Sequence, residues 1–253
     1  MKIKVLFQNN NLLVLDKPVG FVVHPDGKTK QKSISEYILK NFKKLKGVGE
    51  NLVVNIAGKE IEIQKPGIVH RLDKDTTGTL IIAKTQNSFE NLKNQFKNHD
   101  IKKEYLALVW GHLKYDTGLI DAPIARSKSD FRKKEVVGSK QRGEVRDALT
   151  RYKVLKRLNI FGEKVTLVNF LPQTGRMHQI RIHSKSIGHP IVGDHLYGPT
   201  KVEFENKYFK NTKTKNNSRQ LLHSKSIAFH NPETGELIKV ESPIPKDMKI
   251  LLK

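Results

Sequence analysis

A cluster of ionisable residues, His70-Arg71-Leu72-Asp73-Lys74-Asp75, separates two short apolar runs. The second run, 79–83, has the length and β-branching of a buried strand. A charged loop between strands delivers polar side chains to the rim of a sheet, where rigid elements hold a functional loop. An ionised Asp73 there could act as a nucleophile or a base. Taken alone, the stretch is also typical of an ordinary polar hairpin loop, which is the simpler interpretation.

A second polar stretch, 174–197, reads T-G-R-M-H-Q-I-R-I-H-S-K-S-I-G-H-P-I-V-G-D-H-L-Y. The Gly-His-Pro sequence at 188–190 is a typical helix stop, so we predict a helix before it. Part of the stretch alternates like a strand, but helical spacing accounts for more of its apolar residues. The helix would carry three basic residues on one stripe, one turn apart: His178, Arg181 and Lys185.

The chain carries a large excess of positive charge. Its 253 residues include 47 Lys and Arg but 25 Asp and Glu, a formal net charge of +22. This excess predicts a polyanionic partner, nucleic acid first and an anionic membrane second. A general bias toward Lys and Asn would explain part of it, as charge that only solvates the surface. The length suits one large domain or two small ones.

Several protein classes are disfavoured by what the sequence lacks. It has no cysteine, which excludes disulfides, thiolate zinc sites and a cysteine nucleophile. No stretch approaches the roughly 20 apolar residues of a membrane span. The N-terminus lacks the apolar region of a signal peptide. We therefore expect a cytoplasmic protein with no membrane partner.

Apolar periodicity predicts the elements around the polar stretches. Helices are expected at 33–45 and 88–98, and strands at 11–15, 79–83, 102–110, 148–155, 164–170 and 221–229. Three further segments stand out: a possible inserted hairpin at 47–65, a basic arm at 126–134 and a lysine-rich mobile loop at 201–218.

The strand predicted at 102–110 has two distinct faces. One face carries Tyr105, Ala107 and Val109, and the other carries Leu106, Leu108 and Trp110. Alone, Tyr105 is best interpreted as an ordinary core tyrosine whose hydroxyl is satisfied.

Five blocks of the sequence, in order, resemble the RluA-type RNA pseudouridine synthases. They are K-P-V-G-F-V-V-H-P at 17–25, H-R-L-D-K-D-T-T-G at 70–78, K-E-Y-L-A-L-V-W-G at 103–111, T-G-R-M-H-Q-I-R-I-H at 174–183 continued by G-H-P-I-V-G-D-H-L-Y-G at 188–198, and L-H-S-K-S-I-A-F at 222–229. The chain departs from the family pattern at four places: Thr77 for Ser, Met177 for Thr, Ser224 for Ala, and the inserted Asn231. The resemblance covers nearly the whole chain.

The resemblance implies an enzyme that turns selected uridines of structured RNA into pseudouridine. The base leaves its ribose, rotates and rejoins through C5, without metal, cofactor or energy source. Ribosomal RNA is the first expected substrate and transfer RNA the second. The implied fold class is α+β, with a mixed, mostly antiparallel sheet divided by a central catalytic cleft and flanked by helices.

The resemblance also assigns catalytic roles to three residues. Asp73 would be the essential carboxylate, and Arg181 would pair with it. Burial raises the pKa of a carboxyl group, so an adjacent arginine helps to keep Asp73 ionised. A nearby anion also stabilises the oxocarbenium character of a breaking glycosidic bond. Tyr105 would stack on the base and is a candidate for taking the C5 proton.

Five more residues are expected to bind the substrate. The target nucleotide must leave its stack, at a cost of a few kcal/mol, and Arg71 is placed to fill the gap or hold the nucleotide. Leu222 would form the aliphatic face opposite the tyrosine. RNA contacts are further expected from His70, Arg176 and His178. No residue is expected to bind a cofactor or a metal.

Many family members carry a small N-terminal S4 RNA-binding domain. The first block begins close to the N-terminus here, so we expect a single catalytic domain over 1–253 without an S4 domain. Target recognition would then depend on this domain, the basic arm and the lysine-rich loop. A monomer is the expected oligomeric state.

Two other chemistries fit some of the same residues. A hydrolase could pair Asp73 with Asp75, about 6.5 to 7 Å apart in an extended loop, a separation that glycosidases use. The intervening Lys74 and the lack of a sugar-stacking Trp disfavour it. A metal site could combine His70, Asp73, His178 and His183, but no HExxH-type spacing supports it, and the neighbouring arginines would repel a cation.

An RNA-binding assembly factor that keeps the fold without catalysis is the alternative from a different functional class. The retained aspartate, tyrosine and arginine of the family blocks disfavour it. The basic composition fits it as well as it fits an enzyme. Loss of turnover with retained RNA binding would reveal such a protein.

Overall fold

The computed structural model describes residues 3–27, 29, 31–56, 58–128, 130, 133–137, 142–212 and 219–252. The chain divides into two compact units. Unit 1 comprises Met1–Lys102 and Ser224–Pro243, and unit 2 comprises Lys103–His223 and Ile244–Lys253. None of the described helices is long and apolar enough to span a membrane.

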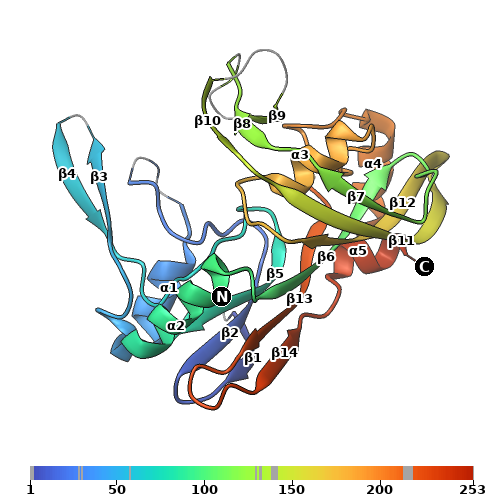
Figure 1. Cartoon of the computed structure of the whole chain (residues 1–253). Helices are drawn as coiled ribbons and strands as arrows, with labels where there is room; N and C mark the ends of the chain where they lie inside the picture. The colour runs from blue at the N-terminus through green and yellow to red at the C-terminus, as the bar shows by residue number, and fades with distance from the viewer. Residues whose placement is uncertain are drawn as a thin grey trace. The chain divides into compact units, whose positions relative to one another are not determined.

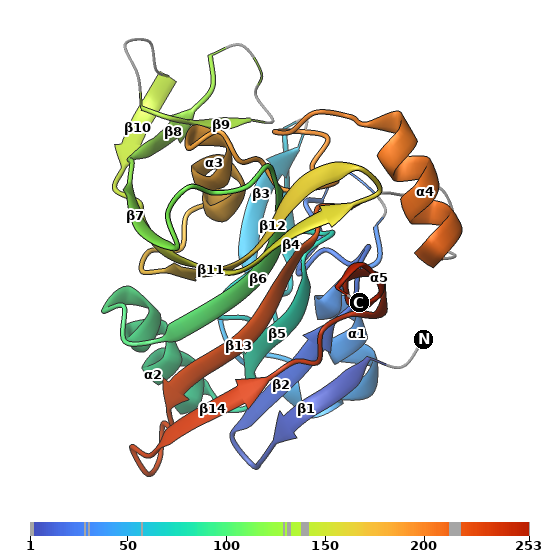
Figure 2. The same ribbon diagram turned by 90° about the vertical axis from the view of Figure 1, so that its right-hand side faces the viewer.

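Unit 1 is built on a mostly antiparallel sheet, whose strands are visible in Figure 2. Its order is β1 (Lys4–Gln8), β2 (Leu12–Lys17), β5 (Thr77–Ala83) and β13 (Leu222–His230), and β14 (Leu237–Glu241) also pairs with β13. Both faces of β2 and β5 are covered, because every residue from Leu12 to Leu15 and from Thr77 to Ala83 is buried. The strand predicted at 79–83 is therefore confirmed, and it begins two residues earlier.

Two helices and a hairpin complete unit 1. The first helix is α1 (Ile34–Asn41), which begins at a Ser33 capping box and is followed by the short 3₁₀ helix η1 (Lys43–Leu45). The second is α2 (Gln86–Lys97), whose Phe89 and Leu92 pack on the sheet. The hairpin of β3 (Leu52–Ile56) and β4 (Lys59–Ile63) lies within the segment expected at 47–65 and projects from the unit (Figure 1).

Unit 2 contains antiparallel strands that follow one another in a sheet. Its order is β6 (Lys102–Trp110), β12 (Glu163–Pro172), β11 (Leu149–Ile160) and β7 (Thr117–Asp121). A smaller sheet has the order β10 (Arg142–Arg146), β8 (Ile124–Arg126) and β9 (Lys134–Val136). The basic arm expected at 126–134 is the connection from β8 to β9, and its residues 129, 131 and 132 lie outside the described part of the chain.

The two faces of β6 belong to different cores, as the alternation predicted. Ala107 and Val109 share a cluster with Ile180 of α3 (Gln179–Ser186), and Tyr105 packs against the same cluster. Leu106, Leu108 and Trp110 share the other cluster with α4 (Val202–Thr212) and α5 (Lys246–Leu251). One strand thus separates a face that carries a candidate site residue, Tyr105, from a face that packs against α4 and α5.

The prediction of a mobile loop at 201–218 is wrong for the first part of this segment, because residues 202–212 form the helix α4. Phe204 and Tyr208 lie one turn apart and are buried, and the Phe204 ring packs edge-on against Trp110 with centroids 4.8 Å apart. These two side chains supply the apolar face that stabilises a short helix in a lysine-rich sequence. Residues 213–218 lie outside the described part of the chain.

Candidate active site

The loop that carries Asp73 is held by a buried lysine. Lys17, the last residue of β2, is fully buried, and its Nζ donates hydrogen bonds to the carbonyl oxygens of Lys74 and Thr76, each at 2.8 Å. A buried ammonium is stable only when its hydrogen bonds are satisfied. Lys17 therefore fixes the backbone on the C-terminal side of Asp73.

Two backbone hydrogen bonds tighten the same loop. The amide of Thr76 donates to the carbonyl oxygen of Asp73 at 3.1 Å, which closes a turn. The amide of Gly20, three residues after Lys17, donates to the Lys74 carbonyl oxygen at 3.0 Å. The K-P-x-G block thus holds the backbone of the H-R-L-D loop through hydrogen bonds from Lys17 and Gly20, and we call this set of contacts the bracket of the loop. Lys17 itself lies in the core of unit 1, where it is 0% exposed.

Side chains of the loop alternate between core and surface. Leu72 is buried, Arg71 is exposed, and Asp73 is half-buried. The leucine anchors the loop from inside, because burying such a side chain contributes roughly 1.5 to 3 kcal/mol. Arg71 and Asp73 are consequently presented from a backbone that is fixed on both sides.

His70 secures the start of the loop. Its Nε2 accepts a hydrogen bond from the backbone amide of Ile81 in β5 at 3.0 Å, and its ring stacks on Phe96 with centroids 4.8 Å apart. An unprotonated Nε2 is required for this bond. Through these contacts His70 has a structural role, and its expected contact with RNA remains a prediction.

The Thr77-Gly78 end of the motif allows β5 to approach β13 closely. Gly78 has φ +113°, and a Cβ there would lie 2.1 Å from the carbonyl oxygen of Ser224. The hydroxyls of Thr79 and Ser224 lie 2.9 Å apart and are buried. The departure from the family's alanine at 224 is thus accommodated by a hydrogen bond.

In unit 2, Tyr105 and Leu222 meet in one apolar cluster. Leu222 is 4% exposed, and Tyr105, half-buried, packs against the cluster that contains it. Ile180 of α3 belongs to the same cluster. Two of the residues predicted to hold the base therefore lie on one side of β6, next to the helix that carries Arg181.

Arg181 forms a buried, two-pronged ion pair with Asp194. Its Nε donates to Oδ2 at 2.6 Å and one terminal nitrogen donates to Oδ1 at 2.8 Å. Asp194 also accepts the amides of Leu196 and Tyr197, and the guanidinium lies over the Tyr197 ring, 5.0 Å from its centroid. This network fixes the guanidinium plane. The pairing of Arg181 with Asp73 remains a prediction.

The start of α3 differs from the sequence prediction. The helix begins at Gln179, and His178 precedes it with a left-handed φ of 60°, so His178 does not share a helical stripe with Arg181. The Nδ1 of His178 lies 2.9 Å from the Tyr197 hydroxyl. Arg176 is half-buried, and its Nε donates to the Asp147 carbonyl oxygen at 3.0 Å. The roles of Arg176 and His178 in RNA binding remain predictions.

His183 supports the fold of unit 2. It is fully buried, and its two ring nitrogens lie 2.9 Å from the Thr150 hydroxyl and 2.9 Å from the Ala122 carbonyl oxygen. Burial lowers the pKa of His183, so the neutral ring is favoured. Within the described residues, no group of three or more His, Asp or Glu side chains is arranged to hold a metal ion.

Three residues that support the loops were not predicted from the sequence to be functional: Lys17, Asp194 and Tyr197. Each lies in one of the family blocks, K-P-x-G or G-D-x-x-Y. Their residue types could have indicated a structural role. A lysine at the end of an apolar strand and an aspartate after a helix that contains an arginine both need partners when they are buried. The sequence did not reveal which partners they would find.

Unit 1 thus fixes the loop of Asp73, unit 2 holds Tyr105, Leu222 and Arg181, and comparisons with known proteins identify the class of protein. The family model for RNA pseudouridylate synthase matches residues 11–186. "Uncharacterized RNA pseudouridine synthase YlyB" of Bacillus subtilis is 35% identical over 253 residues, 100% of this chain and 72% of that protein. "Ribosomal large subunit pseudouridine synthase D" of Nitrosomonas europaea is 37% identical over 250 residues, 99% of this chain and 64% of that protein.

Two solved structures share the fold. The human RNA pseudouridylate synthase domain-containing proteins 1 and 4 align with TM-scores of 0.70 and 0.69. Their sequence identities are 24% and 23%, over 96% and 98% of this chain and 83% and 92% of those chains. The chain belongs to the RNA pseudouridylate synthase family, and it is an isomerase of that class.

Proposed function

We propose that this protein converts specific uridines of structured ribosomal RNA to pseudouridine, with Asp73 as the catalytic carboxylate. The observation that carries the proposal is the bracket around Asp73. Lys17 holds the carbonyl oxygens of Lys74 and Thr76, and Leu72 is buried on the other side. A catalytic group needs its backbone fixed in this way, because small displacements of a reacting group cost much of its rate advantage.

The proposed reaction breaks the bond between C1′ and N1 and forms one between C1′ and C5. The proton leaves C5, and N1 gains one. Ionised Asp73 stabilises the positive charge that develops on the sugar, or attacks the sugar or base, or removes a ribose proton. Arg181 keeps Asp73 ionised, and Tyr105 stacks on the base and takes the C5 proton. Leu222 forms the opposite face of the base pocket, and Arg71 holds the RNA strand.

Ribosomal RNA is the proposed substrate because relatives that cover the chain are named for the large ribosomal subunit, such as the Nitrosomonas europaea protein. The experiment uses RNA labelled with tritium at uracil C5, purified from cells that lack this protein. Ribosomal and transfer RNA fractions are incubated separately with the purified enzyme. Tritium release from the ribosomal fraction alone supports the proposal, and release from the transfer RNA fraction alone contradicts its choice of substrate.

A non-catalytic RNA-binding assembly factor is the second candidate function. The strongly basic composition favours it as much as it favours an enzyme, since phosphate contacts need no chemistry. In the same experiment, such a protein would bind ribosomal RNA tightly and release no tritium from any fraction.

A further inference from the structure

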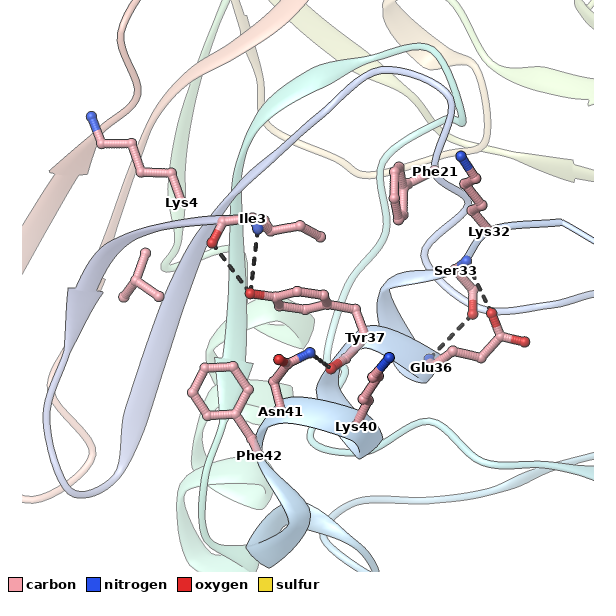
Figure 3. A pocket seen from close by; sticks show the side chains of 11 residues that line it. Ile3, Lys4, Phe21, Lys32, Ser33, Glu36, Tyr37, Lys40, Asn41 and Phe42 are labelled. Carbon is pink, nitrogen blue, oxygen red and sulfur yellow. Dashed lines mark hydrogen bonds between the residues drawn. The ribbon is translucent and has the colours of Figure 1, made fainter. Parts of the chain in front are cut away.

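A groove with a volume of about 1210 Å³ lies between β1 and α1 of unit 1 (Figure 3). Its lining combines aromatic rings with lysines. The groove residues are Ile3, Lys4, Val5, Phe21, Lys32, Ser33, Glu36, Tyr37, Lys40, Asn41 and Phe42. None of them belongs to the residues to which the reaction has been assigned.

The aromatic rings of the groove are partly exposed and held in place. Phe21, Tyr37 and Phe42 are each half-buried, and the rings of Tyr37 and Phe42 are 6.4 Å apart. The Tyr37 hydroxyl lies 3.3 Å from both the amide and the carbonyl oxygen of Ile3, which joins α1 to the start of β1 (Figure 3). Exposed rings on a fixed frame suit the stacking of planar bases.

The charged side chains of the groove are mainly positive. Lys4, Lys32 and Lys40 are exposed, and among the described residues that line the groove one is acidic, Glu36. Glu36 is engaged in the capping box, where its Oε2 accepts the Ser33 amide at 3.3 Å. The groove therefore attracts an anionic ligand along a wall that also offers stacking surfaces.

The groove is tied to the loop of Asp73 by a short piece of backbone. Phe21 directly follows Gly20, whose amide donates to the Lys74 carbonyl oxygen at 3.0 Å. The next residue, Val22, exchanges backbone hydrogen bonds with the segment that starts α1, including one from its amide to the Lys32 carbonyl oxygen at 3.1 Å. Both the wall of the groove and the proposed catalytic loop are thus fastened to the turn at 17–22.

We propose that this groove binds a single-stranded segment of RNA that flanks the target uridine. Lys4, Lys32 and Lys40 would contact its phosphates, and bases would stack on Tyr37 and Phe42. The inference rests on the proposed function only for the identity of the RNA, and its test is a binding measurement that does not require turnover. An acidic protein partner would be attracted by the same lysines, but it would not use the aromatic rings for base stacking.

The first test reverses charge in the groove with the double variant K32E/K40E. The matched control is K246E/K249E, which makes the same change in net charge on exposed lysines of α5. Binding of a fluorescein-labelled oligouridylate is measured by anisotropy over a range of salt concentrations. The groove variant is expected to bind at least tenfold more weakly than the control. The slope of log Kd against log salt should fall by about 0.7 for each phosphate that the variant no longer neutralises.

The second test addresses stacking. Phe42→Leu keeps apolar bulk at the groove but removes the ring, and it is expected to weaken oligouridylate binding about fivefold or more. Photocrosslinking with a 4-thiouridine oligonucleotide, mapped by mass spectrometry on the wild-type protein, should label the segment 32–42. A urea unfolding curve for each variant shows that the fold is kept.

The proposal is overturned if K32E/K40E binds the oligouridylate as tightly as K246E/K249E, or if no crosslink falls within the groove residues. Tritium release distinguishes this failure from failure of the proposed function. A wild-type protein that binds RNA through the groove without releasing tritium supports the groove and contradicts the reaction. If K32E/K40E releases tritium as fast as the wild-type protein at subsaturating RNA, the result contradicts the groove alone.

Discussion

At the scale of single residues, each unit holds its candidate site residues through buried charges that are satisfied by specific partners. Lys17 is bound to backbone carbonyls of the Asp73 loop, and Arg181 is bound by Asp194. The sequence predicted the polar residues of the motifs but did not indicate that Lys17 would be buried. Residue type alone cannot show that a lysine will be buried, because its burial is decided by carbonyl groups 57 and 59 residues away.

Replacing Lys17 by Met should lower the free energy of unfolding by about 2 to 4 kcal/mol, because buried carbonyl oxygens lose their donor. Tritium release should fall at least tenfold, since the loop of Asp73 loses its bracket. Urea unfolding and the release assay measure the two effects. Lys40→Met, at an exposed lysine, is the stability control and should stay within about 0.5 kcal/mol of wild type. Wild-type stability in Lys17→Met would contradict the structural role.

Lys103, on β6, gives a prediction about pH. Its Nζ donates to the Thr174 carbonyl oxygen at 3.2 Å, and burial lowers its pKa from 10.5 to about 8. The folded state thus carries a penalty for the charged form that is complete below pH 8 and disappears as the pH rises to 10.5. Lys103→Met should be more stable than wild type at neutral pH, by at most about 3 kcal/mol.

The stability difference between Lys103→Met and wild type should shrink steadily above about pH 8, since the neutral lysine no longer costs energy. Chemical unfolding of both proteins across this range measures the difference, in which other titrating groups cancel. A constant difference from neutral to alkaline pH would show that the Lys103 ammonium is as well solvated in the folded state as in the unfolded chain.

At the scale of elements, hydrophobic periodicity predicted helices α1 and α2 and the longer of the described strands, β2, β5, β6, β11, β12 and β13, but not the short strands β1, β7 to β10 and β14. The two faces of β6 were predicted correctly because each alternate residue packs into a different core. Helix α4 was missed because its apolar face is short, and its lysine and asparagine content gave no sign that Phe204 and Tyr208 would pack into the cluster around Trp110. The start of α3 was placed too early, since the left-handed His178 is stabilised by a distant tyrosine.

Gly78→Ala tests the close approach of β5 to β13. The added Cβ would lie 2.1 Å from the Ser224 carbonyl oxygen, at a φ of +113° that disfavours any side chain. We expect a loss of at least about 3 kcal/mol in unfolding free energy. Gly58→Ala is the matched control, because its φ is +81° and no atom lies within 4 Å of the added Cβ. It should cost only about 1 kcal/mol, and an equal loss in both variants would exclude the steric explanation.

At the scale of the whole molecule, the formal net charge of +22 is the dominant property. If this charge serves RNA binding, raising salt from 50 to 200 mM should raise the KM for RNA by about tenfold or more while kcat changes little. Steady-state tritium release at several RNA concentrations separates the two parameters. A KM that is insensitive to salt would instead favour the interpretation in which most lysines only solvate the surface.

The most direct measurement of the central claim compares Asp73→Asn with Asp75→Asn in the tritium-release assay on ribosomal RNA. Asp73 and Asp75 lie in the same loop and both residues are half-buried, so Asp75→Asn is the matched control. The account predicts that Asp73→Asn releases no detectable tritium yet binds RNA normally, and that Asp75→Asn keeps most of its activity. Equal release by Asp73→Asn and wild type would contradict the assignment of the reaction to Asp73.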